Sequence, residues 1–130
     1  MKTPFALLLY LTLSLLFSAC APLRPATPTG LMDVAERPAE KALLAGIRAY
    51  EDGQYAEAEK QLALSLQLAL PSVKDRAAAH KHLAFIYCTS QREAECEAAF
   101  RAARQADPAF VLSKSEAGHP QWGPVYKRLQ

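Results

Sequence analysis

Apolar residues recur with the period of an α-helix through most of the chain after residue 38. In residues 93–106, apolar positions three and four residues apart share one helix face: Cys96, Ala99, Phe100 and Ala103. Alanine is abundant and β-branched residues are scarce from residue 39 to residue 110, which also favours helix. The pattern predicts an all-α fold with four long helices, at about residues 39–52, 55–69, 75–89 and 92–106.

One segment carries a conflicting pattern. Leucines alternate with other residues from Leu62 to Leu70, and a period of two is typical of a strand. We interpret the segment as helix, because Ala, Leu and Gln are strong helix formers and no residue in it is β-branched. These leucines would spread around most of the helix, so we expect some of them to face solvent, the C-terminal segment or a partner.

The predicted helices form two similar pairs, about 38 residues apart. In the first pair the small residues Gly46 and Ala58 fall where the two helices are expected to touch. The pattern resembles the tetratricopeptide repeat (TPR), a helix pair of 34 residues that buries its apolar face on a neighbouring unit. The resemblance implies two repeats, at about residues 39–72 and 77–110, with extra residues around Pro71 between them.

Residues 111–130 have specific turn chemistry. Ser113 and Glu116 have the spacing of a capping box, which predicts one short helical turn. Gly118 is expected to end that turn in the left-handed conformation, and Pro124 to begin a last short helix. We therefore expect this segment to cap the second repeat through four residues that pack on the repeat surface: Phe110, Trp122, Val125 and Tyr126.

The chain begins with an apolar run, Pro4 to Ala19, that has the length of a signal-peptide core and falls short of the ~20 residues that span a bilayer. Ser18-Ala19-Cys20 resembles the lipobox of bacterial lipoproteins. The resemblance implies a signal peptide at residues 1–19 and a covalent lipid, such as palmitate, on Cys20. Ala21 rather than Asp follows the cysteine, which favours the outer membrane. The alternative is an ordinary secretory peptide with a chance cysteine.

Residues 20–38 form a linker that cannot bury a core. Four prolines interrupt it and favour an extended polyproline II conformation: Pro22, Pro25, Pro28 and Pro38. We interpret the linker as a spacer that lets the folded domain stand off from the membrane, with a recognition motif as the alternative.

Two cysteines remain for the folded domain, Cys88 and Cys96. They lie at similar distances from the turn predicted between the last two long helices, so a disulfide fits if their Cα atoms come within about 7 Å. The alternative is a pair of buried free thiols, since free cysteine packs well in a core.

The sequence lacks the motifs of an enzyme. It contains no Gly-rich phosphate loop, no Gly-x-Ser-x-Gly elbow and no Cys/His/Asn constellation, which predicts no catalytic residue and no small-molecule substrate. His80 and His82 are two residues apart on a helix and cannot chelate one ion, so we expect no metal and no cofactor beyond the lipid. A net charge of +2 without a basic block argues against nucleic acid.

Protein binding is then the remaining class of function. In TPR arrays the first helix of each pair lines the concave face, and the register places eight residues there: Leu43, Ile47, Tyr50, Glu51, Ala78, Lys81, Phe85 and Thr89. Five of these are the residues predicted to form a binding site on the concave face: Leu43, Ile47, Tyr50, Lys81 and Phe85. Such a partly apolar face suits a peptide or a helix. The alternative is that the C-terminal segment of the same chain fills the groove.

A narrower resemblance covers the chain from about residue 41 to its end. It is carried by Ala84-Phe85-Ile86-Tyr87-Cys88, Arg92-Glu93, Cys96, Asp107-Pro108-Ala109-Phe110-Val111-Leu112 and the segment from Glu116 to Tyr126. These residues resemble the TPR lipoproteins associated with type VI secretion systems (the TssQ type). The resemblance implies a periplasmic assembly factor, anchored in the outer membrane, with a protein partner in the secretion complex. The alternative is a pilotin-like or outer-membrane assembly lipoprotein that serves another envelope machine.

Overall fold

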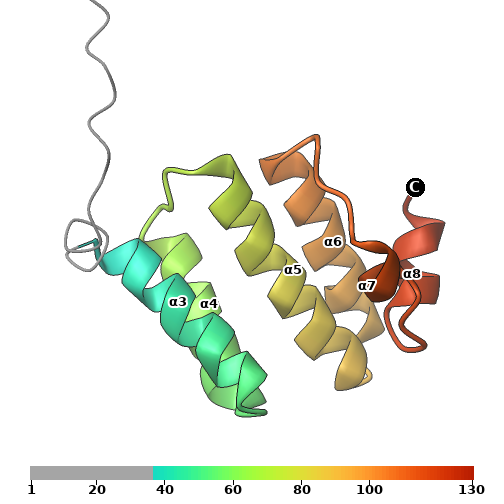
Figure 1. Ribbon diagram of the computed structural model, residues 1–130, viewed down its shortest axis with the longest axis horizontal. Coiled ribbons are helices and arrows are strands. Elements are labelled where there is room, and N and C mark those ends of the chain that lie inside the picture. The colour runs from blue at the N-terminus through green and yellow to red at the C-terminus, as the bar shows by residue number, and fades with distance from the viewer. Residues whose placement is uncertain (1–36) are drawn as a thin grey trace, which may run out of the picture.

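The computed structural model describes residues 37–130 and folds them into six helices, with no strand in that range. Four long helices come first, namely α3 (Pro38–Glu51), α4 (Tyr55–Gln67), α5 (Val73–Thr89) and α6 (Glu93–Ala106), followed by the short α7 (Lys114–Ala117) and α8 (Gly123–Arg128). Figure 1 shows α3 beside α4 and α5 beside α6, with α8 next to α6 and α7 next to α8. The prediction of an all-α fold with two antiparallel helix pairs and a C-terminal capping segment is confirmed.

The predicted signal peptide at residues 1–19, the lipidation of Cys20 and the linker as far as residue 36 lie outside the described residues. Between residues 37 and 130, none of the helices combines the length and the apolar character needed to cross a bilayer.

The first pair packs closely because Gly46 has no side chain. A Cβ atom at this position would lie 2.7 Å from Cγ of Leu62 on α4, closer than such atoms approach each other in folded proteins. Leu62 and Ala58 are fully buried against α3. The turn to α4 is made by Gly53, whose φ of 73° is in the left-handed region that glycine adopts without strain.

The alternating leucines are helical up to Gln67 and then leave the helix. Leu64 and Leu68 are 38% and 43% exposed, as the helical interpretation requires. The helix ends two residues before the predicted end, because Ala69 has a φ of 59° and turns the chain. This turn carries Leu70 back into the core, where it is 1% exposed.

The loop between the pairs is fixed at both ends. The Arg76 guanidinium donates to the backbone carbonyls of Leu70 and Pro71, at 2.7 and 2.9 Å. Ser72 caps the next helix by accepting a hydrogen bond from the Asp75 amide. This cap explains why α5 begins at Val73, two residues earlier than the sequence pattern predicts.

The C-terminal segment contains the predicted capping box. Ser113 accepts from the Glu116 amide, and the Glu116 carboxylate accepts from the Ser113 amide. The left-handed Gly118 was a wrong prediction, since its φ is −84°. The amides of Gly118 and His119 stay on a helical path and donate to the carbonyls of Lys114 and Glu116, so the turn needs no positive φ.

Candidate interaction groove

The inner face of α5 lies between the end of α3 and the C-terminal segment. We call this face, with the two segments that flank it, the groove. The rings of Tyr50 and Phe85 are 6.3 Å apart, and the Lys81 ammonium lies 5.7 Å from the centre of the Phe85 ring. The structure thus brings together three of the five residues predicted for the binding site on the concave face. Ile47, one turn before Tyr50 on α3, is half-buried and packs on the same core.

Leu43 and Phe85 belong to the core rather than to an open binding face. They are 5% and 3% exposed, so a partner could not reach them without unfolding the groove. The Trp122 ring stacks on Phe85 at a centroid distance of 4.2 Å, and His119 stacks on the outer side of Trp122. The C-terminal segment therefore fills this end of the groove, which was the alternative considered from the sequence.

The predicted packing residues of the C-terminal segment lie on the second helix pair. Tyr126 and Val125 are buried, Phe110 is half-buried, and the Tyr126 ring contacts both Phe100 and Phe110. The Tyr126 hydroxyl accepts from the Leu112 amide, and the Trp122 indole N–H donates to the Glu116 carbonyl at 2.8 Å. Each aromatic polar group is thus satisfied, and the segment is held in one position.

Lys81 and Glu116 connect the groove floor to the segment. The Lys81 ammonium donates to the Glu116 carboxylate at 2.7 Å, and both side chains are partly shielded from water. Burial alone would raise the pKa of Glu116, but hydrogen bonds from Lys81 and Ser113 outweigh it and hold that pKa below its ordinary value. Glu116 is therefore a charged anchor at neutral pH.

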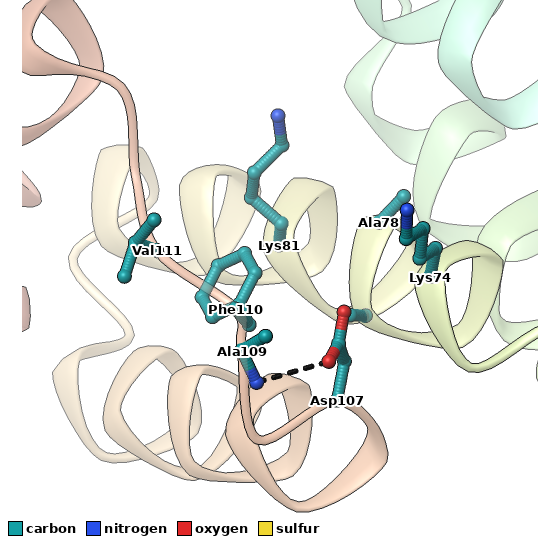
Figure 2. Close-up of a pocket in the computed structure, with 8 residues that line it drawn as sticks. Lys74, Ala78, Lys81, Asp107, Ala109, Phe110 and Val111 are labelled. Carbon is teal, nitrogen blue, oxygen red and sulfur yellow. Dashed lines mark hydrogen bonds between the residues drawn. The ribbon is translucent and has the colours of Figure 1, made fainter.

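Beyond this anchor the groove opens into a cavity of about 270 Å³ (Figure 2). Its floor is α5 and its opposite wall is the chain after α6, and it is lined by Lys74, Ala77, Ala78, Lys81, Asp107, Ala109, Phe110 and Val111. Asp107 is turned back on its own loop, since its carboxylate accepts from the Ala109 amide at 3.0 Å. Val111 is 73% exposed at the rim, and Lys74 has no ion-pair partner within residues 37–130. The cavity therefore offers an apolar wall beside an ammonium group.

Sequence reasoning placed Ala78 on this face but missed Lys74 and Val111. The sequence did indicate a turn at this place, because Asp107-Pro108 ends α6 and forces the chain to change direction. It did not indicate where the chain goes next, because the direction of the turn depends on the packing of Phe110.

Half-exposed aromatic groups line the other end of the groove. Tyr50 contacts Tyr55 at 5.7 Å and His82 at 5.3 Å between ring centroids. Burial lowers the pKa of His82, and its Nδ1 lies 2.7 Å from the Ala78 carbonyl. Burial also raises the pKa of the Tyr50 hydroxyl. The rings of Tyr50 and His82 are therefore neutral at pH 7, and this end of the groove presents a mixed aromatic and polar surface.

Cys88 and Cys96 are joined by a disulfide, with their Cα atoms 5.2 Å apart. The same turn is clamped by Arg92, which donates to both carboxylate oxygens of Glu59 on α4, at 2.9 and 3.1 Å, and lies 4.3 Å from the Tyr87 ring centre. This turn therefore links the two helix pairs as well as α5 and α6.

His80 is half-buried on α5, and burial lowers its pKa. Within residues 37–130 no group of three or more His, Cys, Asp or Glu side chains is placed to hold a metal ion. No protein-family model, curated protein or solved structure matches this chain.

Proposed function

We propose that this chain is a lipoprotein anchored in the outer membrane through Cys20, and that its helical domain is a protein-interaction module accessory to a type VI secretion system. Its compartment is the periplasm and its partner is a protein of the secretion complex. The proposal assigns no catalytic activity, metal or nucleic acid to the chain.

The observation that carries the proposal is the groove of the second pair, together with the C-terminal segment that forms one of its walls. Trp122 and Tyr126 lie in the segment that resembles the TssQ-type lipoproteins, and they are the residues that seat the segment on α5 and α6. Phe110 and Val111 then form the wall of the open cavity. A partner that buries an apolar side chain against this wall would gain about 1.5–3 kcal/mol from that side chain alone.

The lipid on Cys20 would hold the groove close to the membrane. Acyl chains contribute about 0.8 kcal/mol per buried CH₂, so several chains on Cys20 would hold the protein on its membrane. The Pro-rich linker would then confine the domain to a shell near membrane-bound partners and raise its effective concentration there.

The test is complementation of a deletion strain, read out as effector secretion and as assembly of the secretion apparatus. We expect Cys20→Ala to leave the fold intact and to abolish complementation, because the domain loses its position. Val111→Asp should also impair complementation, by placing a charge on the apolar wall, whereas Leu64→Asp on the exposed side of α4 is the matched control.

Normal secretion and assembly in the deletion strain would contradict the proposal. Crosslinking from position 111 in living cells distinguishes the type VI secretion system from another envelope machine. Capture of components of another envelope machine would favour the pilotin-like alternative.

A further inference from the structure

The two cysteines of the disulfide lie in different environments. Cys96 is 0% exposed and belongs to the buried core of the second pair, together with Ala99 and Phe100. Cys88, near the end of α5, is partly exposed and packs against that core from outside. An attacking thiolate must reach a sulfur atom, so access alone distinguishes the two ends of this bond.

A cavity leads to the exposed end. It has a volume of about 280 Å³ and is lined by Cys88, Gln91, Glu93, Gln121 and Val125, and Cys96 is not among its lining residues. Its walls come from the α5–α6 turn and from the C-terminal segment, which is fixed there by ion pairs of Arg128 with Glu93 and Glu97. The cavity therefore reaches Cys88, while the fold covers Cys96.

We propose that Cys88 is the site of thiol–disulfide exchange in this protein, and that its reaction partner is the dithiol of a Cys-x-x-Cys oxidoreductase. A thiolate of the partner attacks Sγ of Cys88, a mixed disulfide forms, and Cys96 leaves as a thiolate that takes up a proton. The second thiolate of the partner then attacks the partner's own sulfur in the mixed disulfide. Cys88 is released as a thiolate and is protonated, so the protein disulfide is reduced and the dithiol is oxidised to a disulfide.

The burial of Cys96 also determines which kind of thiol compound can reduce the disulfide. The leaving thiolate stays beside the mixed disulfide and can displace the attacker again, so a monothiol yields little net reduction. A dithiol resolves the intermediate from the other side and completes the reaction. This inference stands independently of the proposed secretion function, because it depends only on the two cysteines and the cavity.

The first experiment compares Cys96→Ser and Cys88→Ser in the full chain, each treated with oxidised glutathione under native conditions. Trypsin cleaves after Lys81, Arg92 and Arg101, so the two cysteines fall on separate peptides and mass spectrometry identifies the modified one. We expect Cys88 in Cys96→Ser to react at least about tenfold faster than Cys96 in Cys88→Ser. In urea the two rates should become similar, since unfolding exposes both thiols.

The second experiment uses the wild-type chain, so it does not depend on the folding of either variant. A Cys-x-x-Cys oxidoreductase whose second cysteine is replaced by serine traps the mixed disulfide, and tryptic mapping shows which sulfur it holds. An adduct on the peptide that contains Cys88 supports the proposal. An adduct on the Cys96 peptide, equal native rates in the first experiment, or no adduct with either sulfur overturns it.

Discussion

The C-terminal segment covers the second helix pair at the end that faces away from the first pair, whereas the described residues place no such segment on the first pair. Trp122 and Tyr126 stack on the second pair, and Lys81 and Arg128 form ion pairs that hold the C-terminal segment in place. The first pair has no such cover among the described residues and exposes Leu64 on α4 and Leu68 directly after it. Two helix pairs of similar architecture thus depend on different interactions: the second on its cap and disulfide, and the first on close packing between its own helices.

Removal of the capping tryptophan should have the largest effect. Trp122→Ala is expected to lower the free energy of unfolding by about 3–5 kcal/mol, because it leaves a cavity over Phe85 and removes one of the two hydrogen bonds that the Glu116 carbonyl accepts. Urea unfolding followed by circular dichroism measures the loss. Val111→Ala, at a residue in the same segment that is 73% exposed, should change stability by less than about 0.5 kcal/mol. Equal losses in the two variants would show that the cap does not stabilise the second pair.

Reduction of the disulfide should have the next largest effect. The bond closes a short loop across a sequence separation of 8 residues, for which loss of loop entropy in the unfolded chain predicts about 2.5 kcal/mol. Urea unfolding with and without dithiothreitol gives the difference. The double variant Cys88→Ser/Cys96→Ser is the control, since dithiothreitol should no longer change its midpoint. A difference below about 0.5 kcal/mol would mean that Arg92 and the core hold the turn without the bond.

Gly46→Ala tests the first pair in the same way. The added Cβ would overlap the Leu62 side chain, so overpacking is expected to cost about 1–3 kcal/mol, offset in part by the better helix propensity of alanine. The cost should be smaller in a Leu62→Ala background, where the overlapping side chain is gone, and a double-mutant cycle measures that coupling. Additive effects would contradict the close contact between α3 and α4.

The smallest expected effect concerns His82, which lies between the two pairs. Burial lowers its folded pKa, so the unfolded chain binds the proton more readily, and stability falls as the pH drops from about 6.5 toward the folded pKa. Lys81, Glu51 and Glu116 also face the ring and contribute to the shift. His82→Gln should flatten the dependence of unfolding free energy on pH in that window. An unchanged slope would assign the dependence to other groups.

The sequence was sufficient to predict the helices, because local chemistry determines where they begin and end. The four long helices lie within two residues of their predicted bounds, and the two-residue differences arise from the Ser72 cap and the left-handed Ala69. Both are single-residue features that the apolar period does not record. Gly118 shows the reverse error, since a glycine that could adopt a positive φ did not need one.

The groove was harder to predict, because register tells which face a residue occupies but not what covers it. Leu43 and Phe85 have the correct register for the inner face, and the C-terminal segment and the neighbouring helices bury them. The open cavity depends on where the chain after Asp107 comes back across α5, which only the packed structure specifies. Packing between segments that are distant in sequence, rather than helix formation, therefore decides which surface is free to bind a partner.

The position of α7 and α8 has a consequence for the number of repeats. Figure 1 shows these helices at the end of the second pair that faces away from the first pair. There Tyr126 contacts Phe100, and Arg128 forms an ion pair with Glu97 on α6. A third helix pair could not stack there without displacing them. Lengthening of the array by duplication is therefore blocked at its C-terminal end.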